Sequence, residues 1–468
     1  MESITPNTET KGMSHLPDDS RNELDLPEWS VDPANARNWS LGKKLYNTAV
    51  PSLLCLLVSF GLAIYSPSHA KVQKEFNTST TLSLLPFTVY VYGLAFGPMV
   101  SAPLSETYGR RFIYVFITPL ALLFILGAGF AKNLATLAVC RVLAGIPISA
   151  PLAVGAGTIM DIWTGVYTNR GVVLLMAIAF MGPALGSLVG GWIAEYKNWP
   201  WSQWTTLFLG AGIWIFSLFA AKKLGLPAPP APIPRGLAGL RFLVMVTLAR
   251  PLYMLFTEPI VALCSLYASL NFSVLFCFLA SVPLIYSTTY GFSLGQCGLA
   301  FIGIPVGCII GTIALILIDS YTLTQHRTRN SDVPPPPERL LWGAMVGSPL
   351  MPASLFWFAW TARPAVHWMS SITATGLFAC SNILIFVSTA LYLTNVYGAK
   401  YGASALAANG LLRYAVGGSF PLFTLAMYNN PGYSWASSLL AFLAVAFVPL
   451  PWIFYRFGNR IRQSSAYT

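Results

Sequence analysis

Hydrophobic residues in this chain come in long, nearly unbroken runs that short polar connections separate. A run of about 20 residues is long enough for a helix to cross the hydrocarbon core of a bilayer. We predict about twelve such spans, at 46–66, 83–104, 112–131, 136–160, 171–194, 203–221, 251–275, 296–318, 340–360, 368–393, 402–427 and 434–455. The pattern therefore predicts an all-α polytopic membrane protein.

The composition supports this prediction and argues against a water-soluble protein. Hydrophobic residues make up 55% of the 468 residues and charged residues only 9%, whereas soluble proteins carry roughly 25% charged residues. The net charge of +11 would suit nucleic-acid binding if the bases gathered on one polar domain. They fall instead in short clusters between apolar runs. We therefore expect a lipid bilayer and a small-molecule substrate as partners, and no nucleic acid.

Polar stretches divide the chain into five parts. Residues 1–45 are polar and acidic, lack the pattern of a cleavable signal, and are predicted to form a disordered cytosolic tail. Two six-helix bundles, at 46–221 and 251–455, flank a cytosolic Pro-rich linker at 222–250 that contains the run PAPPAPIPR. Residues 456–468 form a second cytosolic tail.

The basic residues favour one side of the predicted membrane. With the N-terminus inside, the external segments hold only Lys71, Lys74, Lys132, Lys197 and Arg363. The cytoplasmic segments hold many more: Lys43, Lys44, Arg110, Arg111, Arg170, Lys222, Lys223, Arg235, Arg241, Arg250, Arg327, Arg329, Arg339, Lys400, Arg456, Arg460 and Arg462. Cytoplasmic loops are enriched in Lys and Arg, so we expect both termini in the cytosol.

The connection between the second and third spans carries a distinctive motif. It reads GPMVSAPLSETYGRR, with Glu106, Gly109, Arg110 and Arg111 between two apolar runs. Gly109 supplies backbone freedom there. The acid and the two bases can join helix ends through charge-assisted hydrogen bonds.

This connection resembles the loop between helices 2 and 3 of the major facilitator superfamily, although Ala102 and Thr107 depart from its pattern. The stretch RVLAGIPISAPLAVGAGTIMDIW resembles the fourth-helix motif of the same family. The second half adds FTEPIVALCSLY, ERLLWGAMVGSPLMPASLFWFAWTARP and ASALAANGLLRYAVGGSFPLF. Together these segments resemble the fungal branch of 12-spanner drug:proton antiporters, which includes multidrug, polyamine and secondary-metabolite exporters. The resemblance implies the major facilitator fold of two six-helix bundles.

The resemblance also implies a latch at the cytoplasmic helix ends that locks one state of the transporter. Its members here are Glu106, Gly109, Arg110, Arg111 and Asp161.

Arg141 lies near the external start of the fourth span. An ionisable residue inside a membrane costs about 3 kcal/mol or more, so it usually has a function or a buried partner. The resemblance implies a base beside a protonation or substrate site. The alternative is an arginine that snorkels to the lipid headgroups.

Two ladders of glycines occur, one in each half. The fifth span contains Gly182, Pro183, Gly186 and Gly190, and the eighth contains Gly303, Gly307 and Gly311. A spacing of four residues places glycines on one helical face, where helices approach closely in lipid. We expect both ladders to line contacts between the two halves, with static packing as the alternative. The first ladder resembles the antiporter signature of the family's fifth helix.

Glu258 and Arg413 are the charges predicted well inside the second half. Counting from the expected starts of spans seven and eleven places them roughly 12 Å and 16 Å into the membrane. We therefore predict that they form a direct or water-bridged pair.

Four further polar residues lie deep in predicted spans: Tyr267, Asn271, Asn382 and Asn409. They are candidates for substrate or proton binding, although hydrogen bonds between helices explain them equally well.

These observations predict a monomeric secondary transporter that works by alternating access around a central site. No ATP-binding P-loop is present, so we expect proton-coupled efflux of a small organic compound across the plasma membrane, without a cofactor. Export of an organic acid or a polyamine, uniport, and import by symport remain open. An enzyme or a metal site is disfavoured, because the histidines are scattered and the cysteines lack metal-ligand spacing: His15, His69, His326, His367, Cys55, Cys140, Cys264, Cys277, Cys297, Cys308 and Cys380. A receptor would leave the glycine ladders without a purpose.

Overall fold

The computed structural model describes residues 35–221, 245–329, 335–463, 465 and 467. Most of the predicted N-terminal tail and of the linker at 222–250 lies outside these residues, as does the side chain of Glu106. All the regular elements in the described residues are helices.

The first half contains α1 (Leu41–Ala63), α2 (His69–Glu75), α3 (Thr80–Tyr108), α4 (Arg110–Phe112), α5 (Thr118–Gly129), α6 (Leu134–Ile148), α7 (Ala150–Ile162), α8 (Val166–Tyr196) and α9 (Pro200–Ala221). Short helical turns η1 (Ala36–Asn38), η2 (Ser66–Ser68) and η3 (Ile113–Ile117) accompany them. Helices α6 and α7 form one span, Leu134–Ile162. Pro147 and Pro151 lie on either side of their joint, where a proline interrupts the helical hydrogen bonds.

The second half contains α11 (Arg250–Thr257), α12 (Pro259–Tyr290), α13 (Leu294–Leu299), α14 (Gly303–Arg329), α15 (Trp342–Thr361), α16 (Trp368–Asn429), α17 (Tyr433–Phe447) and α18 (Leu450–Gln463). It also has the turns η4 (Met245–Ala249), η5 (Ala300–Ile302) and η6 (Pro337–Leu341). Helix α16 contains a non-helical residue, Gly398, with φ of 58°. This positive φ favours glycine and divides α16 into two segments.

Ten of the described helical stretches are long and apolar enough to cross a membrane. Two more have the length of a span, namely α9 with 22 residues and the segment of α16 after Gly398. The prediction of about twelve transmembrane helices in two bundles is thus confirmed.

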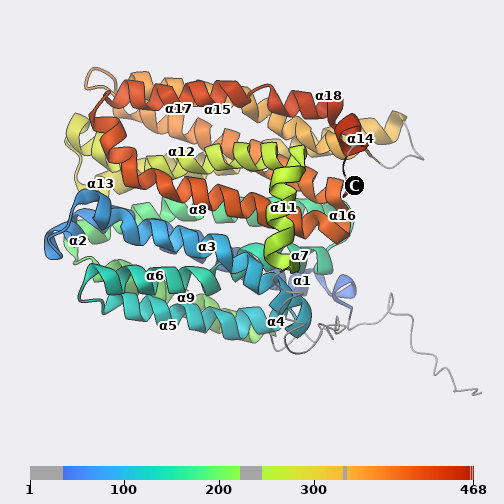
Figure 1. Cartoon of the computed structure of the whole chain (residues 1–468), viewed down its shortest axis with the longest axis horizontal. Coiled ribbons are helices and arrows are strands. Elements are labelled where there is room, and N and C mark those ends of the chain that lie inside the picture. Colours follow the sequence, from blue (N-terminus) through green and yellow to red (C-terminus); the bar gives the residue numbers. More distant parts are fainter. Residues whose placement is uncertain (1–34, 222–244, 330–334, 464, 466, 468) are drawn as a thin grey trace, which may run out of the picture.

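Figure 1 shows the first half, coloured blue to green, below the second half, coloured yellow to red. The long helices run side by side along the horizontal axis of that view. We name the end near α4 and α11 the basic end, because α4 contains Arg110 and Arg111 and α11 begins at Arg250. The end near α2 and α13 is the opposite end.

The start of the seventh span differs from the prediction at 251. The chain turns at Glu258, whose φ of −102° and ψ of 107° are extended, and the long helix α12 begins at Pro259. Before that turn, α11 runs across the basic end of the other helices (Figure 1). Counting hydrophobic residues could not reveal the turn, because α11 is itself rich in apolar residues.

Candidate functional site

Arg141 of α6 lies inside the first half and is only 1% exposed. Its guanidinium donates to the carbonyl oxygens of Gly61 at 2.9 Å, of Leu62 at 3.4 Å and of Pro86 at 3.4 Å. It also donates to the side chain of Gln203 at 3.4 Å. The arginine thereby joins α6 to α1, α3 and α9. This burial does not fit an arginine that snorkels to the headgroups.

Two tyrosine rings complete the surroundings of Arg141. Its guanidinium carbon lies 4.3 Å from the ring centroid of Tyr90 and 5.2 Å from that of Tyr65. The two hydroxyls are fixed in turn, because Tyr90 donates to the carbonyl of Val58 at 3.1 Å and Tyr65 to that of Ser83 at 2.7 Å. Arg141 is therefore satisfied by carbonyls and rings and needs no carboxylate.

Arg413 of α16 has different surroundings. Its guanidinium carbon lies 4.4 Å, 4.6 Å and 4.5 Å from the ring centroids of Phe272, Phe386 and Tyr414. We name these three rings the Arg413 cage. The buried Nε atom of Arg413 has no hydrogen-bond partner. Each cation–π contact contributes roughly 0.5–2 kcal/mol, whereas taking a charge out of water costs several kcal/mol, so the cage offsets only part of that cost.

The Arg413 cage lies at the boundary between the two halves. Phe180 of α8, from the first half, packs against Phe272 at 5.3 Å and Phe386 at 5.1 Å between ring centroids. Nearby on α16, Ser419 hydrogen-bonds Tyr92 of α3 at 2.8 Å. Arg413, on the second half, thus lies close to residues of the first half.

Most acidic residues of the described structure lie at or near helix ends: Glu75, Glu106, Asp161, Glu195, Glu258 and Glu338. Asp319 lies inside α14, ten residues before its end, and is paired with Arg339. Arg141 and Arg413 lie among the described helices without an acidic side chain as a partner, whereas Asp319 is neutralised by Arg339. The middle of the molecule is positive.

The predicted pair of Glu258 and Arg413 is wrong as a direct contact. Glu258 accepts a hydrogen bond at 2.9 Å from the hydroxyl of Tyr397, beside the kink at Gly398. The error arose from the start of the seventh span. Because α12 begins at Pro259, Glu258 lies at the basic end, whereas Arg413 lies about 22 Å along its own segment of α16.

The glycine ladders pack within the halves, contrary to the prediction. A Cβ at Gly186 would lie 2.5 Å from the carbonyl oxygen of Phe60 on α1, and one at Gly190 2.5 Å from that of Ile64, directly after α1. Gly182 likewise faces α1, and Pro183 lies buried inside α8. The second ladder, Gly303, Gly307 and Gly311, faces the first segment of α16. The spacing predicted close packing correctly but could not identify the neighbour.

Another glycine of α8 makes the contact between the halves. A Cβ at Gly191 would lie 2.5 Å from the carbonyl oxygen of Leu294 on α13. One turn further, the carboxylate of Glu195 accepts hydrogen bonds at 2.7 Å from the Ser293 hydroxyl and the Gly295 amide. These contacts join the halves at the opposite end. The sequence analysis assigned no role to Glu195, although an acid one turn after a Gly-Gly pair was visible.

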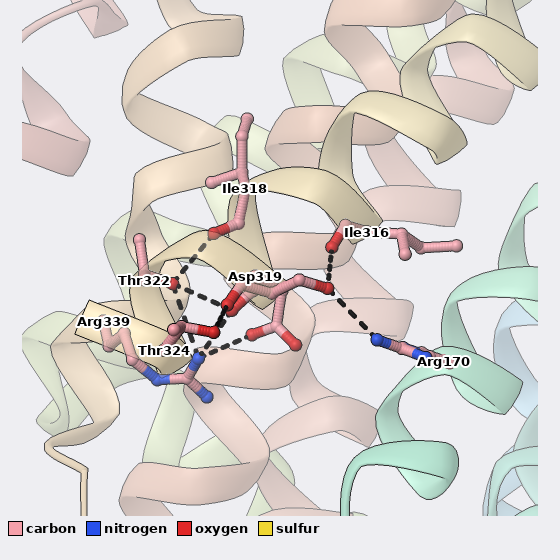
Figure 2. A network of polar contacts seen from close by, with 8 residues as sticks. Arg170, Ile316, Ile318, Asp319, Thr322, Thr324 and Arg339 are labelled. Carbon is pink, nitrogen blue, oxygen red and sulfur yellow. Dashed lines mark hydrogen bonds and ion pairs between the residues drawn. The ribbon is translucent and has the colours of Figure 1, made fainter. Parts of the chain in front are cut away.

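A polar network joins the halves at the basic end (Figure 2). Arg170 of α8 donates to the Ser320 hydroxyl of α14 at 3.2 Å. The neighbouring Asp319 pairs with Arg339 at 2.8 Å. A small hollow lies beside this network, between α8 and α14–α16. We missed Asp319 because the predicted eighth span ended at 318, whereas α14 continues to Arg329.

The predicted latch residues lie at the basic end of the first half. Arg110 pairs with Asp161 at 3.2 Å and donates to Ser105 at 2.8 Å. Gly109 has φ of 82°, a conformation that favours glycine and turns the chain toward Asp161. The side chain of Arg111 is exposed, and that of Glu106 lies outside the described residues.

The four deep polar candidates have mixed surroundings. Tyr267 stacks on Phe447 at 5.4 Å within the second half, and Asn271 donates to the Tyr267 carbonyl of its own helix at 2.9 Å. Asn382 is 1% exposed and both its amide atoms lack partners, whereas Asn409 is 4% exposed. Asn382 lies one turn from Phe386, and Asn409 one turn from Arg413, each on the same face of α16, so both are close in register to the Arg413 cage.

Comparison with known proteins agrees with this architecture. The family model described as "Major Facilitator Superfamily" matches residues 52–421. The chain is also similar in fold to a solved structure of the human organic anion transporter MFSD10 (TETRAN), with a TM-score of 0.64 and 13% identity over 88% of this chain and 99% of that one.

Several curated fungal proteins are more similar in sequence. Polyamine transporter 4 of Saccharomyces cerevisiae is 35% identical over 99% of this chain and 76% of its own length. MFS-type transporter traF of Penicillium crustosum is 35% identical over 100% of this chain and 98% of its own length. Efflux pump FUB11 of Gibberella moniliformis is 34% identical over 97% of this chain and 77% of its own length. The resemblance drawn from the motifs is confirmed, and the chain belongs to the major facilitator superfamily of multi-pass membrane transporters.

Proposed function

We propose that this transporter exports a small organic compound across the plasma membrane in exchange for protons, as a monomer with both termini in the cytosol. The observation that carries the proposal is the construction of the boundary between the halves. Separate polar contacts join the halves at each end, Glu195 with Ser293 and Arg170 with Ser320. The Arg413 cage lies between them. Alternating access requires two ends that open in turn around a central site.

The name of one relative, an efflux pump, supports export. The basic clusters, which favour the cytoplasmic side, support the proposed orientation.

Proton exchange is proposed without a carboxylate at the centre. The acids placed to bind and release protons are those of the end contacts, because breaking such a contact frees the carboxylate oxygens to bind a proton. Glu195 and Asp319 are the two in contacts at the boundary or beside it.

Transport by the purified full chain in lipid vesicles tests the proposal. A candidate compound is loaded, and its release is followed with and without an inward proton gradient. We expect release to accelerate with the gradient and to return to the basal rate when nigericin collapses it. A rate that ignores the gradient would exclude proton exchange. Glu195→Gln should weaken the response, whereas Glu75→Gln, at the same end but bonded within the first half to Trp199, is the matched control.

A further inference from the structure

The inference concerns the chemical class of the substrate and rests on the transport function proposed above. We propose that the transported compound is a small organic anion, a carboxylate with an apolar body. Its carboxylate binds the guanidinium of Arg413, and its body packs against the Arg413 cage and Phe180.

The distribution of charge is the first argument. Arg141 and Arg413 lie inside the described helices without an acidic partner, whereas the acid that lies well inside a helix, Asp319, is already paired with Arg339. Arg141 already donates to carbonyls of Gly61 and Leu62. The positive charge of Arg413 has no such acceptor at its Nε, so it is the charge that a ligand can neutralise.

The geometry of Arg413 is the second argument. Aromatic rings at 4.4–4.6 Å from the guanidinium carbon attract the cation through their faces. The neutral hydroxyl of Tyr414 is a hydrogen-bond partner of Arg413, but the Nε atom remains without one. The planar fork of an arginine matches the two oxygens of a carboxylate. The side chain also remains only half-buried, so part of its surface is accessible.

The origin of the surrounding rings is the third argument. Phe272 and Phe386 belong to the second half, and Phe180 of the first half packs on both. An apolar body held among these rings contacts both halves at once. Binding therefore acts on the boundary that must open and close. Asn382, with an unpartnered amide one turn from Phe386, can donate to the same anion.

The same arrangement disfavours cations. A polyamine placed here would meet the charge of Arg413, which pairs with no acid in the described residues, and like charges in a low-dielectric site repel strongly. This separates the proposed substrate from the one named for the polyamine relative.

Binding to the purified full chain tests the inference with phenylbutyrate, phenylbutyramide and phenylbutylamine. These probes share a body and differ in charge. In the wild type at neutral pH we expect phenylbutyrate to bind at least about tenfold more tightly than the amide. The amine and spermidine should bind still more weakly. Equal binding, a preference for the amine, or no binding of phenylbutyrate would overturn the inference.

Variants then locate the site. Arg413→Gln should weaken phenylbutyrate binding at least about tenfold and leave amide binding unchanged. The affinity of Arg413→Lys for phenylbutyrate should lie between those of the wild type and Arg413→Gln, because lysine keeps the charge but loses the planar fork. Arg456→Gln, an exposed arginine on α18, is the matched control. If Arg413→Gln still preferred phenylbutyrate over the amide to the same extent, the inference would be overturned. The measurement on the wild type tests the inference even if the variant does not fold.

Failure of the inference is distinguishable from failure of the proposed function. Binding is measured without a proton gradient and is therefore independent of proton exchange. Proton-driven transport of a neutral or cationic compound would overturn only the proposal that the substrate is an anion. Selective binding of phenylbutyrate without a response to the gradient would overturn only the proton exchange.

Discussion

The interior of the first half and the boundary between the halves use the same residue types for different purposes. In the interior, Arg141 gives its hydrogen bonds to carbonyls of three neighbouring elements, and Gly186 lies against α1. At the boundary, Arg413 has rings on its faces and an unpartnered Nε, and Gly191 lies against α13. A buried arginine or glycine is thus structural or functional according to what it faces.

Replacing the two arginines tests this comparison with the largest expected effect. Arg141→Ala leaves several buried carbonyls without their donor and should lower the free energy of unfolding by about 3 kcal/mol or more. Arg413→Met removes an incompletely compensated charge and should cost no stability. Thermal unfolding of the purified variants in detergent measures both. Equal losses would show that the two arginines have the same structural role.

Replacing the two glycines should give a smaller effect. Gly186→Leu overpacks the contact with α1, so we expect a loss of about 1–3 kcal/mol and low protein levels. Gly191→Leu obstructs only the contact with α13. This variant should accumulate normally but fail to transport. Protein level in the membrane and transport are measured for each, and the reverse assignment would contradict the packing described.

Replacing Glu258 tests whether this residue at the basic end contributes to stability independently of Arg413. Glu258→Gln weakens the charge-assisted hydrogen bond from Tyr397 and should cost about 1 kcal/mol. Because Glu258 and Arg413 share no contact, its effect should add to that of Arg413→Met within about 0.5 kcal/mol. The two single variants and the double variant form the test. Recovery of stability in the double variant would restore the pairing that the structure contradicts.

The latch pair should give the smallest effect on stability. The side chains of Arg110 and Asp161 are 27% and 43% exposed, and such ion pairs contribute about 0–1 kcal/mol. Asp161→Asn should therefore leave thermal unfolding nearly unchanged while altering the transport rate. A large loss of stability, insensitive to salt, would show that the pair is a structural bond of the first half.

Sequence patterns predicted the spans well because membrane-length hydrophobic runs follow directly from bilayer thickness. They failed at Glu258 and Asp319, where helices turn or continue among mixed residues. The start of α12 and the end of α14 depend on local backbone geometry, which the hydrophobic pattern does not contain.

The candidate site was predictable only in part. The motifs identified Arg110, Asp161 and Arg141, and the cost of a buried charge identified Arg413. The residues that contact Arg141 and Arg413 could not be predicted. The cage of Phe272, Phe386 and Tyr414 joins residues far apart in the chain, and aromatic residues are too common in membrane spans to single them out. The hydrogen-bond acceptors of Arg141 are mostly backbone carbonyls. Every residue has one, so the sequence does not show which of them accept.

Helix α8 carries a contact within the first half and a contact between the halves on different faces. Gly190 meets α1 and Gly191 meets α13, and consecutive residues of a helix differ by about 100° in direction. One residue inserted before Gly182 would therefore turn the ladder away from α1 and bring other side chains to that surface. Substitutions in α8 leave the direction of its other side chains unchanged, whereas an insertion rotates them. Insertions in this helix must therefore come in near-whole turns to keep both contacts.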